Sequence, residues 1–185
     1  GKEATHYFFV SEIKARDLKN VEMMMGDRND PYAMLSFASW EHRTEFIDGA
    51  GSHANWKYDK AKHADQVCFQ VSTEELSSGI MRAVVNDKNK MMADKLIGSG
   101  EAKLPNALMP VGIEIKSETV TGEVIIPLVD KHGKATGNIT IFVQRETNVR
   151  EKSDSTNSHA KSVEEKKVPR VEAGTDFSKL KHSLY

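Results

Sequence analysis

The sequence predicts an all-β protein, an eight-stranded antiparallel sandwich. Short apolar segments rich in aromatic and β-branched residues recur through the first three quarters of the chain. Turn residues separate these segments, as at Gly49-Ala50-Gly51 and at Lys131-His132-Gly133-Lys134. Many short strands with turns between them are typical of an antiparallel sandwich. In the last segment Ile139, Ile141 and Val143 occupy every second position, so they would face one side of a strand.

Each expected strand has a local basis in the sequence. The first carries the aromatic run Tyr7-Phe8-Phe9, and the second follows Asn29-Asp30-Pro31-Tyr32. Pro31 fixes its own φ and disfavours a helical backbone at Asp30, so the Asp30 carboxylate is placed at a junction between loop and strand. Residues 105–121 receive no assignment. The expected strands cover residues 7–15, 32–38, 43–47, 66–72, 80–86, 96–103, 122–128 and 138–144.

A change of composition after Arg145 predicts a domain over residues 1–146 and a charged extension over 147–185. Ser, Asn, Lys and Glu dominate from Glu146 to Lys167, and such a segment buries too little apolar surface to offset its ordering entropy. The extension is expected to be partly extended or helical. Near its end four apolar residues recur at helical spacing and predict a short anchor that contacts a partner or the domain itself. These residues are Phe177, Leu180, Leu184 and Tyr185. The alternative is an incidental tail.

Several segments, taken in order, resemble the C2 domain, a calcium- and lipid-binding sandwich of eight strands. Ala15-Arg16-Asp17-Leu18 followed by Asn29-Asp30-Pro31-Tyr32 is similar to the opening of that family. Val85 to Asn89 and Leu96-Ile97-Gly98 bracket what would be its third loop at the top of the sandwich. Gly122 to Leu128 and Gly137 to Val143 resemble its last two strands. The resemblance covers about residues 5–146.

This resemblance implies a calcium site of about five carboxylates on two loops, and the chain keeps only part of it. Asp30 and Asp87 match, whereas Met24, Asn89 and Lys95 stand at the other three positions. Nearby carboxylates could compensate in part, so the candidate ligands are Asp27, Asp30, Asp87, Asn89 and Asp94. Calcium takes six to eight oxygen ligands, and a lysine ammonium competes for the same space. We expect low calcium affinity or none; the alternative is that these side chains only order the loops.

Methionines give a second indication of function. In the family the first and third loops are neighbours, so the resemblance brings together the residues Met23, Met24, Met25, Met91 and Met92. Burying one such side chain contributes about 1.5–3 kcal/mol. Flanking cations would meet anionic headgroups, and these are Lys88, Lys90 and Lys95. The sequence therefore predicts docking on an anionic membrane; contact with a protein partner and packing within the loops are the alternatives.

A second lipid surface is a further candidate, because basic residues lie on and after the third expected strand. These are His42, Arg43, Lys57, Lys60 and Lys62. Acidic neighbours such as Asp59 and Glu45 dilute the patch, so a solvated face is the alternative.

Composition limits the remaining function classes. A formal net charge of −1 gives no global attraction to nucleic acid, so no nucleic-acid partner is expected. Cys68 is the only cysteine, which suits a reducing compartment. No nucleophile, phosphate-loop or metal-protease motif occurs, so we do not expect an enzyme. The sequence predicts a cytoplasmic module, either at the periphery of a membrane or within an intracellular assembly. In the second case it would be a structural, protein-binding C2 domain anchored by its tail.

Overall fold

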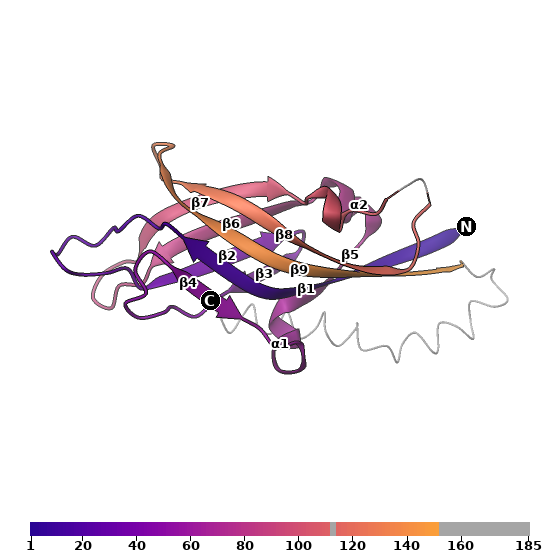
Figure 1. The fold of residues 1–185 in the computed structure, drawn as a ribbon, viewed down its shortest axis with the longest axis horizontal. Coiled ribbons are helices and arrows are strands. Elements are labelled where there is room, and N and C mark those ends of the chain that lie inside the picture. Colours follow the sequence, from indigo (N-terminus) through magenta and orange to yellow (C-terminus); the bar gives the residue numbers. More distant parts are fainter. Residues whose placement is uncertain (112–113, 152–185) are drawn as a thin grey trace.

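The computed structural model of the chain describes residues 1–111 and 114–151, and nine strands form one curled sheet within them (Figure 1). All strand pairs are antiparallel, which confirms the expected sandwich class. The strands are β1 (Lys2–Arg16), β2 (Pro31–Phe37), β3 (Trp40–Arg43), β4 (Ala54–Lys57), β5 (Cys68–Val71), β6 (Ile80–Asp87), β7 (Lys95–Lys103), β8 (Glu118–Val129) and β9 (Ala135–Glu151).

Two layers arise where this sheet curls between β7 and β8. The order is β3-β2-β6-β7-β8-β9-β1-β4, with β5 also paired to β1. The register between β7 and β8 contains a single pair, Ser99 with Val129. Glycines allow the close passage there: a Cβ on Gly98 would lie 2.1 Å from Thr136 Oγ1, and one on Gly100 would lie 2.1 Å from the Pro127 carbonyl oxygen.

Apolar side chains from both layers fill the space between them. An aromatic group lies at its centre: the Trp40 and Phe69 rings stack at 4.3 Å, and Phe8 lies 5.3 Å from Phe69. The Trp40 indole N–H donates to the Gln66 carbonyl oxygen at 3.0 Å, so its polar atom is also satisfied.

Two short helices flank strand β5, which covers most of the strand expected over residues 66–72. Helix α1 (Lys60–Val67) begins where the Asp59 side chain accepts from the Ala61 N–H. Helix α2 (Thr73–Ser78) begins with a capping box between Ser72 and Glu75. These caps satisfy backbone donors locally, and only β5 remains of the expected strand. A 3₁₀ turn, η1 (Asn106–Leu108), lies in the segment that received no assignment.

The third strand differs from the expected range of residues 43–47. Strand β3 ends at Arg43, and Thr44 instead uses its hydroxyl to accept from the Ala33 N–H at 2.8 Å. Strand β4 was not expected at all, because its four residues are too few to show a clear alternation. It pairs with β1 and accounts for the ninth strand.

Strands β1 and β9 form a long ribbon that extends beyond the rest of the sandwich (Figure 1). Their register runs from Lys2 with Glu151 to Arg16 with Asn138. Pairing thus continues past residue 146, into the segment whose composition suggested an extension. The anchor residues Phe177, Leu180, Leu184 and Tyr185 lie outside the described residues.

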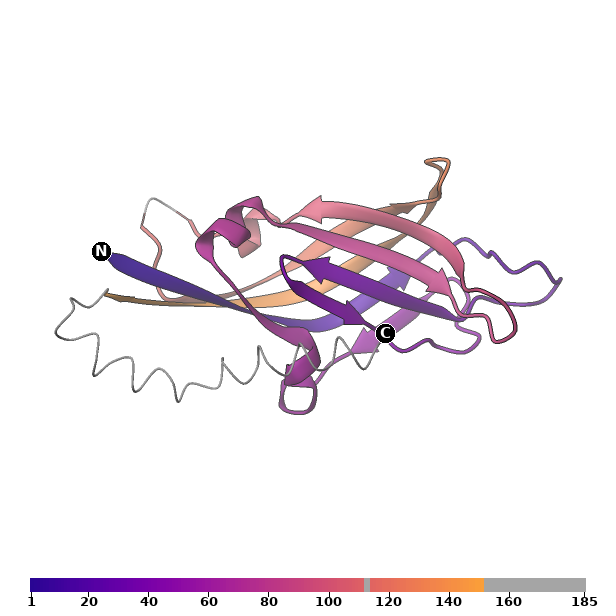
Figure 2. The same ribbon diagram turned by 180° about the vertical axis from the view of Figure 1, so that it is seen from behind.

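Three connections lie close together at the other end of the sandwich (Figure 2). They are residues 17–30, 44–53 and 88–94, and backbone hydrogen bonds link the first of them to the other two. The Lys88 N–H donates to the Asp30 carbonyl oxygen at 2.9 Å, and the Gly51 N–H donates to the Asn29 carbonyl oxygen at 3.0 Å. The Lys19 N–H donates to the Thr136 carbonyl oxygen at 3.0 Å. We call this end the loop rim.

Candidate functional site

Asp30 and Asp87 meet at the loop rim. Strands β2 and β6 are antiparallel, so the start of one lies beside the end of the other, and Pro31 pairs with Asp87. The Asp30 backbone N–H donates to Asp87 Oδ1 at 2.7 Å. The two residues that the sequence placed at strand ends are therefore direct neighbours.

A third carboxylate, Glu22, completes an acidic cluster. One carboxylate oxygen from each of Glu22, Asp30 and Asp87 lies within 4.8 Å of the others. Asp87 is fully buried, and its Oδ2 atom has no hydrogen-bond donor. A hydrogen bond that protonated Glu22 would donate to Asp87 raises the pKa of Glu22; burial and the negative charge of Asp87 act in the same direction, and Lys95 opposes them.

Sequence reasoning did not find Glu22. The family pattern places its first carboxylate six residues before Asp30, where this chain has Met24. Glu22 lies two residues further back in the longer first loop, and the fold brings it beside Asp30 and Asp87. A search that allowed the loop length to vary would have found this carboxylate.

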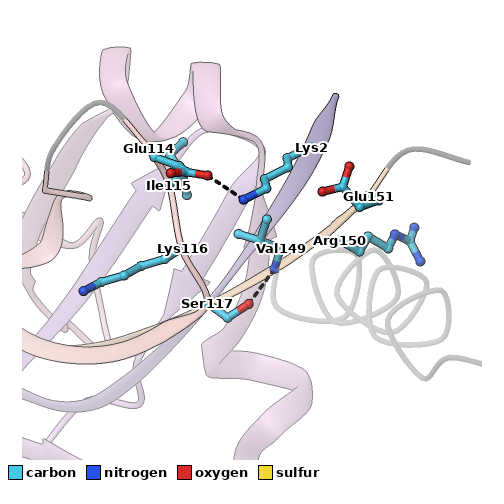
Figure 3. A pocket seen from close by; sticks show the side chains of 8 residues that line it. All are labelled: Lys2, Glu114, Ile115, Lys116, Ser117, Val149, Arg150 and Glu151. Atoms are coloured by element: carbon cyan, nitrogen blue, oxygen red, sulfur yellow. Dashed lines mark hydrogen bonds and ion pairs between the residues drawn. The ribbon is translucent and has the colours of Figure 1, made fainter.

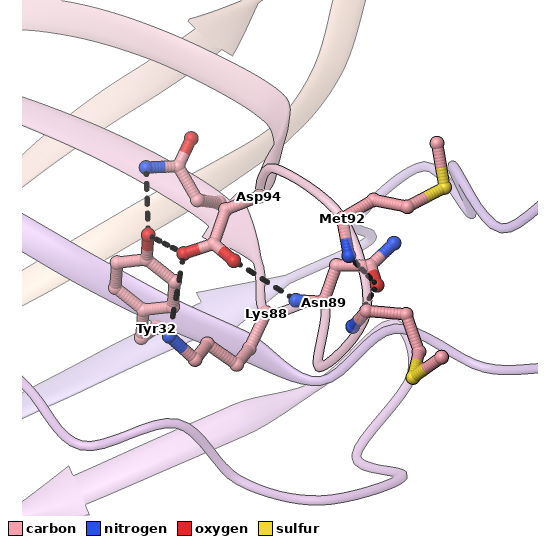
Figure 4. Close-up of polar contacts among 7 residues, drawn as sticks. Tyr32, Lys88, Asn89, Met92 and Asp94 are labelled. Carbon is pink, nitrogen blue, oxygen red and sulfur yellow. Dashed lines mark hydrogen bonds and ion pairs between the residues drawn. The ribbon is translucent and has the colours of Figure 1, made fainter.

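Asp94 and Asn89, two of the expected ligands, form hydrogen bonds that order the third loop (Figure 4). The Tyr32 hydroxyl donates to Asp94 Oδ2 at 2.5 Å, and the Asn89 backbone N–H donates to Asp94 Oδ1 at 2.9 Å. These bonds, led by the one from Asn89, lower the pKa of Asp94. The Asn89 side-chain oxygen accepts from the Met91 and Met92 N–H groups.

Asp94 is not part of the acidic cluster, and the exposed Asp27 is not part of it either. The cluster thus contains two of the four expected carboxylates, Asp30 and Asp87, and adds Glu22, which was not expected.

The acidic cluster suits a cation but offers it few ligands. Asp30 Oδ1 already accepts from the Gly49 N–H at 2.6 Å, and Asp87 Oδ1 accepts from Asp30. The buried Asp87 Oδ2 is the oxygen that most needs a positively charged partner. Calcium takes six to eight oxygens, so three carboxylates with two oxygens already engaged form a sparse site. Lys95 pairs in register with Asp87 and brings a competing charge.

The loop methionines project from the rim into solvent. Their exposed fractions are 86% for Met23, 70% for Met24, 103% for Met25, 91% for Met91 and 72% for Met92. In Figure 4 the Met92 side chain extends away from the contact between Tyr32 and Asp94. With exposed fractions this high, the five methionine side chains are not packed within the loops, which was one alternative for their role.

The lysines of this region differ in their surroundings. Lys88 Nζ lies 3.8 Å from Asp94 Oδ2, whereas Lys90 is exposed and Lys95 is half-buried. Positive charge thus lies on the same loop as two of the methionines.

Of the residues in the expected basic patch, Lys57, Lys60 and Lys62 are exposed, whereas His42 is not available at the surface. His42 is buried, and its Nε2 atom lies 2.8 Å from the Tyr58 hydroxyl oxygen. The Arg43 guanidinium stacks over the Tyr32 ring at 4.5 Å. The expectation was wrong for His42 because this side chain faces the interior.

A pocket of about 610 Å³ lies beside the free end of the β1–β9 ribbon (Figure 3). Lys2 Nζ and Glu114 Oε1 form an exposed ion pair at 2.5 Å across it, and the Val149 N–H donates to the Ser117 hydroxyl at 2.9 Å. Its lining carries both signs of charge, and it is remote from the acidic cluster.

Comparison with known proteins points to one fold. No family model matches the chain. The multiple C2 domain and transmembrane region protein 6 of Arabidopsis thaliana is 28% identical over 96 residues, which are 52% of this chain and 8% of that protein. The chain therefore spans a small fraction of this curated relative. No helix among the described residues is long and apolar enough to cross a bilayer.

Among solved structures, the first C2 domain of a plant extended synaptotagmin 1 superposes with a TM-score of 0.50 at 14% identity, over 81% of this chain and 97% of that domain. A C2 domain-containing protein from a putative elicitor-responsive gene gives 0.45 at 16% identity, over 82% of this chain and 93% of the other. The described part of this chain has the fold of a C2 domain.

Proposed function

We propose that this chain is a non-enzymatic module that docks peripherally on the anionic, cytoplasmic surface of a membrane through its loop methionines. The observation that carries the proposal is the exposure of five methionines on two adjacent loops of the rim. Exposed apolar side chains beside lysines are the combination that interfacial insertion requires. The similarity to C2 domains supports the same class of function.

Docking at the rim would leave the fold unchanged. The acidic cluster lies behind the methionine tips, where Asp30 and Asp87 hold the first and third loops together through the bond between the Asp30 N–H and Asp87 Oδ1. The loops are thus positioned before any membrane contact, which lowers the ordering cost of binding.

Replacing the five loop methionines by serine is expected to weaken vesicle binding at least about a hundredfold, because several buried side chains each contribute about 1.5–3 kcal/mol. The measurement is sedimentation with vesicles of phosphatidylcholine and phosphatidylserine, in calcium and in chelator. The variant should unfold at the same temperature as the wild-type chain, since these side chains are outside the core.

The matched control replaces Val111 and Ile125, which are exposed apolar residues away from the rim, by serine. This control should bind as the wild-type chain does. Undiminished binding by the methionine variant would contradict the proposal, and no binding of the wild-type chain in either condition would favour a protein partner.

For calcium we propose weak binding held by Glu22, Asp30 and Asp87, with a dissociation constant of about 0.1–1 mM. Glu22→Gln should abolish it, because one of three carboxylates is lost. Asp27→Asn removes a carboxylate from the same loop that is outside the acidic cluster, so it should leave the affinity nearly unchanged. Isothermal titration calorimetry with calcium distinguishes the two variants. Equal losses in both would mean that the cluster is not the site.

A further inference from the structure

We propose that the five loop methionines form a site of reversible oxidation, and that their conversion to sulfoxides releases the module from the membrane. This inference rests on the proposed docking function. It adds a redox control that acts on the docking residues themselves.

The methionines of the chain fall into two groups by accessibility. Five lie at the loop rim with exposed fractions of 70% or more. Met81 is fully buried in β6, and Met34 and Met109 are half-buried. Oxidation of a thioether follows its access to the oxidant, so a dissolved peroxide would reach the rim first. The buried Met81 supplies an internal reference in the same chain.

The chemistry is a transfer of one oxygen atom from hydrogen peroxide to the methionine sulfur. An S–O bond forms, the O–O bond breaks, and water leaves; the sulfur is oxidised by two electrons and the peroxide is reduced. A methionine sulfoxide reductase reverses the change with two thiols, which become a disulfide while the sulfoxide oxygen leaves as water. The oxidation therefore needs only the peroxide, and its reversal needs a methionine sulfoxide reductase with thiols.

Oxidation would act on docking and not on folding. Met91 and Met92 contribute their backbone N–H groups to the Asn89 side-chain oxygen, and their side chains are outside the core. A sulfoxide on these side chains leaves that backbone contact in place. It does make the tip polar, and a polar group without a hydrogen-bond partner is unfavourable in hydrocarbon.

The experiment treats the full chain with hydrogen peroxide and maps sulfoxides by peptide mass spectrometry. Binding is measured by sedimentation with phosphatidylcholine–phosphatidylserine vesicles before oxidation, after it, and after reductase and thiol. We expect sulfoxides at the rim before Met81. We also expect binding to fall at least about tenfold, since that is the smallest factor that the loss of one buried side chain gives, and to return after reduction. Circular dichroism should remain unchanged.

A variant with leucine at the five rim positions is the matched control, because leucine keeps the apolar tip and has no sulfur. Its binding is compared only with its own binding before oxidation, and peroxide should leave that binding unchanged. If the unoxidised wild-type chain fails to bind, the docking function is overturned together with this inference. If the wild-type chain binds vesicles and the oxidised chain binds them equally, only the redox control is overturned. The same holds if peroxide also weakens vesicle binding by the leucine variant.

Discussion

Replacement of Arg145 by leucine is expected to lower the free energy of unfolding by about 3–5 kcal/mol, the usual cost of removing one partner from a buried charged contact. Arg145 is fully buried in β9. Its Nε donates to the Leu108 carbonyl oxygen at 2.7 Å, one terminal nitrogen donates to Glu118 Oε1 at 2.8 Å, and the other donates to the Thr147 hydroxyl.

Leucine would fill part of the volume and leave these acceptors without their donor. A buried acceptor without a donor keeps its full desolvation penalty, which destabilises the native state. Urea denaturation measures the loss. Arg82→Leu is the matched control, because Arg82 forms an exposed ion pair with Glu101 at 3.0 Å and should cost less than about 1 kcal/mol. A loss for Arg145→Leu as small as that of the control would show that the buried guanidinium does not hold η1 and β8 against β9.

Acidification from pH 6.5 to pH 4 is expected to reduce stability by about 3 kcal/mol through His42 alone. Burial, with a small contribution from the charge of His63, lowers the pKa of His42 from 6.5 to about 4. The ring stacks on Trp40 at 6.0 Å, bonds to the Tyr58 hydroxyl through Nε2, and leaves Nδ1 buried without a partner. Protonation of the ring would therefore create a buried positive charge, and Nδ1 would have no acceptor for its proton.

Acidification destabilises the native state because the unfolded chain binds a proton at His42 more readily. Between the two pKa values the unfolded chain binds a proton at His42 and the native chain does not, so stability is complete above pH 6.5 and falls until about pH 4. His6, whose pKa is lowered by burial and then by Arg145, acts in the same direction. Urea midpoints across this pH range measure the effect.

His42→Gln keeps a polar group near Tyr58 and does not titrate, so its stability should vary less with pH. His132→Gln, in the exposed turn between β8 and β9, should reproduce the wild-type profile. An unchanged slope in His42→Gln would show that other groups set the acid sensitivity.

Much of the fold was predictable because its strands carry strong local patterns. The alternating residues Ile139, Ile141 and Val143 are all buried, as expected for one face of a strand. The four-residue strands β3 and β4 were misplaced or missed, because so short a segment shows no period. The strand expected over residues 66–72 was close to the observed β5, which is shorter because Val67 ends helix α1 and Ser72 caps helix α2.

The candidate site was predictable only where residues are fixed by strand ends. Asp30 and Asp87 meet because the β2–β6 register aligns them. Glu22, Asp27 and Asp94 lie in long loops, where the path of the backbone decides which carboxylate points inward. Asp94 accepts a hydrogen bond from Tyr32, which is 62 positions away in the sequence, and no local pattern reveals this contact.

The long ribbon of β1 and β9 separates the chain positions at its far end from the loop rim by most of the length of the molecule. Strand β1 has 15 residues, which at about 3.3 Å per residue span about 50 Å. Lys2 and Glu151 lie at the pole opposite the methionine tips. In the proposed docking geometry, this end of the ribbon would therefore stand away from the bilayer and leave the methionine loops sterically clear.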